Sequence, residues 1–121
     1  MEEKELKELL LERLHIELQL FRDSMLRKTK EDIYEASYKI EVFVNLYEIL
    51  LEDVGNMDAE TMRGLICWEH GILEALYQEW LTRDDGSYDE LRAYAVDEVR
   101  GIAQSEKRKE LEDGSEHDQV A

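Results

Sequence analysis

The chain has no proline, a single cysteine and only six glycines among its 121 residues. Without proline, no helix is interrupted by a missing N–H group or by a ring that clashes with the preceding turn. Gly64 and Gly101 lie inside helical patterns, which they weaken. The single cysteine, Cys67, excludes an internal disulfide and fits a reducing compartment, and we expect it to be buried as a small apolar side chain. No apolar run approaches the roughly 18 residues of a membrane-spanning helix, and the charged start does not resemble a secretory leader. We therefore expect one cytoplasmic domain.

Basic side chains are scarce in most of the chain. Residues 1–30 carry seven acidic and seven basic side chains, whereas residues 31–121 carry 24 acidic and eight basic ones, so the whole net charge of −16 lies in the longer part. Solubility requires a net charge of only about 2–8 in a small domain. So negative a protein repels nucleic acid and acidic membranes and attracts basic protein surfaces. The charge therefore favours a basic protein as the partner.

Apolar side chains recur with helical spacing, and no stretch alternates as a strand would, so the predicted fold class is all-α. Five helices are expected, over residues 3–28, 30–54, 58–66, 72–81 and 87–111. Thr29, Asp58 and Ser87 precede three of them as capping residues. The two long N-terminal helices should form an antiparallel hairpin on which the shorter C-terminal helices pack. The domain is expected to span residues 1–111, followed by a flexible acidic tail over 112–121.

The first predicted helix has a wide apolar surface. Its main stripe consists of Leu6, Leu10, Leu14, Leu18, Phe21 and Met25, and Leu9, Ile16 and Leu20 widen it. So wide a surface predicts burial against more than one neighbour, or against a second copy of the chain. The second helix carries a coiled-coil-like seam of Ile33, Ala36, Ile40, Phe43, Tyr47, Leu50 and Val54.

Three short patterns have the spacing of metal ligands. Glu12 and His15 match half of a carboxylate-bridged di-metal site, but a second such pair is missing. Cys67 and His70 likewise lack the second pair of ligands that a structural zinc site needs. The acidic turn at residues 84–90 does not fit the ligand pattern of a calcium loop. The chain also has no phosphate-binding glycine loop and no nucleophile elbow. We predict a binding protein without catalytic activity, metal or cofactor.

The outer face of the second predicted helix is acidic. Opposite the seam lie Glu31, Tyr34, Tyr38, Glu41, Glu48 and Glu52, here called the acidic row, together with Asn45. Acids four residues apart on a helix are separated by about 6 Å, which sparsely matches the phosphates of a DNA strand at ~3.4 Å intervals. The two tyrosines are of the kind that anchors protein interfaces. A second acidic cluster comprises Asp84, Asp85, Asp89 and Glu90. The plain alternative is a solvated helix face.

A resemblance adds a biological setting. Gly71–Leu81 contains Leu-Tyr-x-x-Trp-Leu, followed by Asp84-Asp85 and the helix start Ser87–Arg92. This pattern resembles a small helical domain family of unknown function from gut clostridia and their phages and mobile elements. The resemblance implies a bacterial cytoplasm and assigns no catalytic residue. Small acidic proteins of that setting include anti-CRISPR proteins that mimic DNA, which is an analogy.

Two functions follow from these observations. The first is a small acidic protein-binding module that inhibits or modulates a basic nucleic-acid-binding protein by occupying its phosphate channel. The alternative is a self-associating helical structural or adaptor protein, in the simplest case a homodimer.

Overall fold

The computed structural model describes residues 2–83 and 88–120, with side chains for 2–83 and 88–109. Every element in this part of the chain is helical, which confirms the all-α prediction. In order, the elements are α1 (Glu3–Leu26), α2 (Lys30–Glu35), α3 (Ser37–Asp53), the short 3-10 turn η1 (Val54–Asn56), α4 (Ala59–Cys67), α5 (Ile72–Trp80) and α6 (Tyr88–Val120). None of the described helices is long and apolar enough to cross a membrane.

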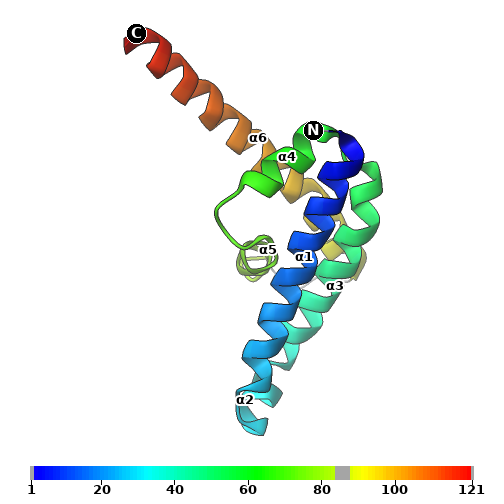
Figure 1. Ribbon diagram of the computed structural model, residues 1–121. Coiled ribbons are helices and arrows are strands. Elements are labelled where there is room, and N and C mark those ends of the chain that lie inside the picture. The colour runs from blue at the N-terminus through cyan, green and yellow to red at the C-terminus, as the bar shows by residue number, and fades with distance from the viewer. Residues whose placement is uncertain (1, 84–87, 121) are drawn as a thin grey trace.

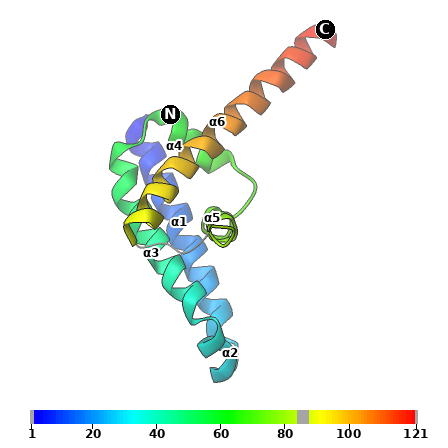
Figure 2. The ribbon, with the colours of Figure 1, turned by 180° about the vertical axis from the view of Figure 1, so that it is seen from behind.

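Helices α1 and α3 lie side by side and run in opposite directions, and α2 connects them at one end (Figure 1). Helix α4 packs on α1 and α6, and α6 also packs on α3 (Figure 2). Both views show that the α2 end of the hairpin reaches beyond the other helices, and that the second half of α6 runs clear of the bundle. The core therefore occupies only one part of the hairpin.

Stripes of apolar side chains build this core. The first three leucines of the predicted α1 stripe are buried, and Phe21 stacks on Phe43 with 4.1 Å between the ring centroids. Helix α3 buries a second stripe beside the predicted seam, formed by Val42, Leu46 and Ile49. The second stripe exists because α3 contacts α5 and α6 as well as α1.

The second predicted helix is not continuous. The structure divides residues 30–54 at Ala36, where φ is −88° and ψ is 8°, between α2 and α3. Apolar spacing does not reveal this break, because Ile33 before it and Ile40 after it line the same groove. The capping prediction at Thr29 is confirmed, since its hydroxyl oxygen accepts a hydrogen bond from the Asp32 N–H at 3.2 Å.

The ends of the later helices agree in part with the sequence. Asp58 caps α4 by accepting a hydrogen bond from the Thr61 N–H at 2.7 Å, and hydrogen bonding to Thr61 lowers the pKa of the Asp58 carboxyl. Ser87 lies outside the described residues. Helix α6 continues to Val120, although apolar spacing fades near Leu111. Missing apolar spacing shows that a segment has no face to bury, and a backbone without proline can still be helical. A flexible tail over 112–121 stays a prediction.

Arg13 joins α1 to the end of α4. Its Nη1 donates to the carbonyl oxygens of Leu65 at 2.6 Å and Ile66 at 2.8 Å, and its Nη2 donates to that of His70 at 2.6 Å. The last carbonyls of a helix have no partner within the helix and carry partial negative charge. The guanidinium therefore closes the C-terminal end of α4 and holds the chain that follows it.

Glu17, one turn further along α1, serves the start of α5. Its Oε2 accepts from Arg13 Nε at 3.1 Å, and its Oε1 accepts from the Leu73 N–H at 2.9 Å. The first N–H groups of a helix favour a negative charge. One ion pair on α1 thus forms hydrogen bonds with the last carbonyl groups of α4 and with an N–H group at the start of α5.

A second polar link joins α6 to the end of α3. The Asp53 carboxylate is 5% exposed and accepts from Arg100 Nη1 at 2.9 Å and Nη2 at 3.1 Å. This two-point hydrogen bond raises the pKa of Arg100. Further along α6, the Tyr94 hydroxyl donates to the Leu76 carbonyl at 2.9 Å, and burial raises the pKa of this phenol.

Helices α4 and α6 cross closely at Gly64. A methyl group added there would lie 2.8 Å from the Ala103 Cα and 2.9 Å from its Cβ. Real side chains do not approach so closely, so the two backbones are in contact only because residue 64 has no side chain. Gly101, on α6, faces open space.

We predict that the two helical glycines respond oppositely to alanine. Gly64→Ala should lower the free energy of unfolding by about 1–3 kcal/mol, because the added methyl forces α4 and α6 apart. Gly101→Ala should raise it by about 0.5–1 kcal/mol, because alanine favours the helix and meets nothing. Urea unfolding followed by circular dichroism measures both. Stabilisation by Gly64→Ala would contradict the close crossing.

We also predict that lysine cannot replace Arg13. Arg13→Lys keeps the charge but has one nitrogen in place of three, so it should lower the free energy of unfolding by about 1–2 kcal/mol. Arg63→Lys is the matched control, because Arg63 is exposed on α4 and makes no hydrogen bond to a described residue. Equal urea midpoints for the two variants would show that the Arg13 bonds do not stabilise the fold.

Candidate functional site

The structure places the acidic row on the outside of the bundle, but on two helices. Glu41, Glu48 and Glu52 are exposed on α3. Glu31 and Tyr34 lie on α2, beyond the break at Ala36, and Tyr34 is 80% exposed. The sequence predicts that the row follows one straight helix. In the structure it is divided between α2 and α3. Its α3 part keeps helical geometry.

Tyr38 differs from Tyr34 in having a structural partner. Its hydroxyl oxygen accepts a hydrogen bond from Trp80 Nε1 at 3.1 Å, which ties the start of α3 to the end of α5. About half of its side chain stays exposed. Tyr38 can contact a partner only as part of this pair.

The single base of residues 31–60, Lys39, does not neutralise the row. Its Nζ lies 3.0 Å from the Glu74 Oε2 on α5 and 5.1–5.8 Å from the centres of three aromatic rings on α1, α3 and α5. Ring faces attract a cation. The ammonium group is therefore held against α5 and forms no ion pair with the acids on the outer side of α3.

Glu41 and Glu48 form no hydrogen bond or ion pair with any residue that the structure describes. Glu52 does, since its Oε2 lies 2.8 Å from Arg92 Nη1 on α6. This ion pair brings the first turns of α6 beside the end of α3. Of the second acidic cluster, Asp89 and Glu90 lie there and are exposed.

Asp84 and Asp85 lie outside the described residues. The described and exposed acids on the outer side of α3 and at the start of α6 are Glu41, Glu48, Glu52, Asp89 and Glu90, which we call the acidic face. Arg92 lies within this face and is bound by Glu52. The face can present carboxylates to a basic surface.

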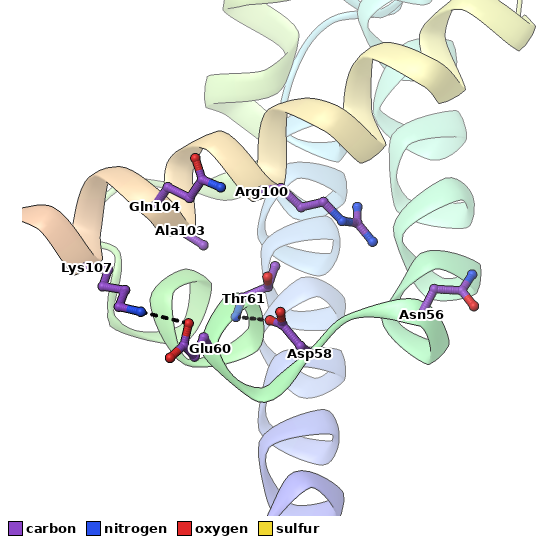
Figure 3. Close-up of a pocket in the computed structure, with 8 residues that line it drawn as sticks. All are labelled: Asn56, Asp58, Glu60, Thr61, Arg100, Ala103, Gln104 and Lys107. Carbon is purple, nitrogen blue, oxygen red and sulfur yellow. Dashed lines mark hydrogen bonds and ion pairs between the residues drawn. The ribbon is translucent and has the colours of Figure 1, made fainter.

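A polar cleft of about 240 Å³ lies between α4 and α6 (Figure 3). It is lined by Asn56, Asp58, Glu60, Thr61, Arg100, Ala103, Gln104 and Lys107. Lys107 Nζ lies 2.9 Å from Glu60 Oε2, Arg100 is bound by Asp53, and Asp58 accepts a hydrogen bond from the Thr61 N–H. The two ion pairs hold α6 to α4 and α3, and Asp58 caps α4.

The residue patterns with metal-ligand spacing do not form a metal site in the described part of the chain. Glu12 and His15 are exposed on α1. Cys67 is exposed, so our expectation of a buried cysteine is wrong. It is the last residue of α4, between Ile66 and Trp68, which pack against the core. Within the described residues, no three His, Cys, Asp or Glu side chains could share a metal ion.

An apolar groove of about 280 Å³ lies at the α2 end of the hairpin. It is lined by Leu18, Phe21, Arg22, Met25, Leu26, Ile33, Ile40, Phe43 and Val44. The sequence identifies most of these as stripe residues. It does not reveal that the other helices stop short of them, because spacing shows which residues share a face and not what covers it.

Comparisons with known proteins add no relative. The chain matches no protein-family model, no curated protein and no solved structure. The resemblance to the clostridial helical family therefore stays a prediction, and the candidate site depends on the geometry of this chain.

We predict that the acids of the acidic face are not needed for folding. Neutralising Glu41 and Glu48 together as Glu→Gln should leave the free energy of unfolding within about 0.5 kcal/mol, or raise it at low salt by reducing self-repulsion. Asp53→Asn is the contrast, because it removes the buried carboxylate that binds the partly exposed Arg100 at two points, and it should lower stability by about 1–2 kcal/mol. Urea unfolding measures both, and a large loss in the double variant would assign these acids a structural role.

Proposed function

We propose that this protein is a small acidic binding module that inhibits or modulates a basic, nucleic-acid-binding protein. One observation carries the proposal. Glu41 and Glu48 are exposed and lack partners in the described part of the chain, while Lys39 is paired with Glu74 on α5 and Arg92 with Glu52. Ordinary helix surfaces mix charge signs and gain stability from pairs one turn apart. Here the uncompensated charge remains available to a partner.

The proposed mechanism is occupation of a phosphate channel. Seven residues along a helix cover about 10.5 Å, so Glu41 and Glu48 are separated by roughly three phosphate steps of a DNA strand. Lysine and arginine side chains that hold a phosphate backbone can therefore meet carboxylates at comparable intervals. Tyr34, exposed at the α2 end, would add an aromatic anchor. Charge complementarity of this kind speeds encounter and weakens as salt increases.

The negative charge and the family resemblance support a particular setting. Both fit a bacterial cytoplasm and a phage or mobile element, in which an acidic protein that mimics DNA would block a host nuclease, as anti-CRISPR proteins do. The proposed activity is stoichiometric binding, without catalysis, metal or cofactor. The target would be defined by its basic, nucleic-acid-binding channel.

The test is affinity capture from a bacterial lysate with matched baits. One bait is the natural chain, the second carries Glu41→Gln and Glu48→Gln, and the third carries Glu12→Gln and Asp23→Asn on α1. The second and third have the same net charge. We expect a basic nucleic-acid-binding protein to bind the first and third baits at low salt. The amount captured by the second bait should be at least tenfold lower. Duplex DNA should displace the protein from the first and third baits.

The third bait separates a specific face from general acidity. Glu12 and Asp23 are exposed and lie on the charge-balanced part of the chain. Equal loss of the captured protein from both variant baits would mean that any two acids suffice, and the acidic face would not be the site. Capture that DNA does not displace would remove the phosphate-channel mechanism.

A further inference from the structure

The apolar groove at the α2 end is open at its rim. Leu26 on α1 is 67% exposed and Val44 on α3 is 40% exposed, and both line the groove. Figures 1 and 2 show this end of the hairpin extending past α5 and α6. A two-helix hairpin without a third layer leaves its apolar seam accessible to water. The groove is therefore an unpartnered surface.

The segment that forms the groove is electrically neutral. Residues 18–44 contain five acidic and five basic side chains, whereas the other residues contain 26 acidic and ten basic ones. Four of the five bases, Arg22, Arg27, Lys28 and Lys30, are exposed near the connection of α1 to α2. None of these four forms an ion pair with a residue in the described ranges. The acids of the segment lie mainly on α2 and at the start of α3.

This charge pattern indicates which kind of partner can bind in the groove. A basic partner gains nothing at a neutral end when an acidic face lies elsewhere. A strongly acidic partner is repelled by the net charge of −16. The fitting occupant has an apolar seam and balanced charges of its own, and a second copy of this chain has both.

We propose that the groove is the interface of a homodimer, in which two copies pack their α2 ends around a two-fold axis. In such an interface, every contact occurs twice, so the bases near the end of α1 in each copy face the acids of α2 in the other. The two hairpin ends then form a four-helix bundle with a shared apolar core. Glu48, Glu52 and the start of α6 stay outside it.

The salt dependence of this dimer is opposite to that of a basic partner. Two bodies of the same sign repel each other over long range, and the screening length falls from about 30 Å at 0.01 M salt to about 8 Å at 0.15 M. Adding salt within this range should therefore strengthen the dimer, whereas it weakens binding of a basic protein to the acidic face. The two proposals can thus fail independently.

Sedimentation equilibrium of the full chain tests the interface. At about 0.15 M salt, we expect a reversible monomer–dimer equilibrium with a dissociation constant in the micromolar range. Leu26→Asp and, separately, Val44→Asp should raise this constant at least tenfold, because each places a charge in the shared apolar core. Circular dichroism checks that the variants are folded. If Leu26→Asp is unfolded, the test relies on Val44→Asp.

Leu20→Asp is the matched control. Leu20 is 64% exposed on α1, nearly as much as Leu26, but it does not line the groove. The control should dimerise like the natural chain. A natural chain that stays monomeric at about 100 μM would overturn the proposal, since a dimer with a micromolar dissociation constant is mostly formed at that concentration. If both groove variants still dimerise like the natural chain, the interface lies elsewhere and the proposal is overturned. The same holds if Leu20→Asp raises the dissociation constant as much as the groove variants do.

Discussion

The ion pair of Arg13 and Glu17 positions the second half of the molecule. Helices α4 and α5 have nine residues each, too few to be stable in water by themselves. Arg13 satisfies carbonyls at the end of α4, and Glu17 satisfies an N–H at the start of α5. Because α5 is held in this place, its Glu74 and Tyr77 can receive the Lys39 ammonium group from the inner side of α3. The ion pair on α1 therefore supports a contact between two other helices.

The charged side chains divide into two groups according to what they contact. One group holds helices together, as Asp53 and Arg100 do across α3 and α6, and its members are close to partners of opposite sign. The other group, represented by Glu41 and Glu48, makes no such contact with the described residues and adds only self-repulsion to the folded state. A fold gains nothing from the second group. Its negative potential acts on whatever approaches the molecule, which is why we locate function there.

How far the sequence predicts this structure depends on the range of each interaction. Helical stripes and the caps at Thr29 and Asp58 arise from neighbours within a few residues. Both caps and the burial of the first leucines of the α1 stripe are confirmed, whereas Leu9, Ile16 and Leu20, expected to widen the buried surface, are exposed. The bonds of Arg13 reach 52–57 residues along the chain to backbone carbonyls, which have no sequence signature. The exposure of Cys67 depends on where α4 ends against α1, and the break at Ala36 preserves apolar spacing. Pattern therefore predicts which residues share a face, and tertiary contacts decide what covers it.

Charge and apolar surface are separated along the same hairpin. Its α2 end is neutral and carries the open groove, whereas the α3 surface beside α6 is negative, so like-charge repulsion opposes a dimer least when the two copies meet at the neutral end. Packing through that end directs the acidic faces of two copies away from the shared core. A partner with two basic tracks, or two copies of one target, could then be bound at both faces at once, and the second contact would form at the high effective concentration that linkage provides. Dimerisation would in this way increase affinity for a basic target without any new contact to it.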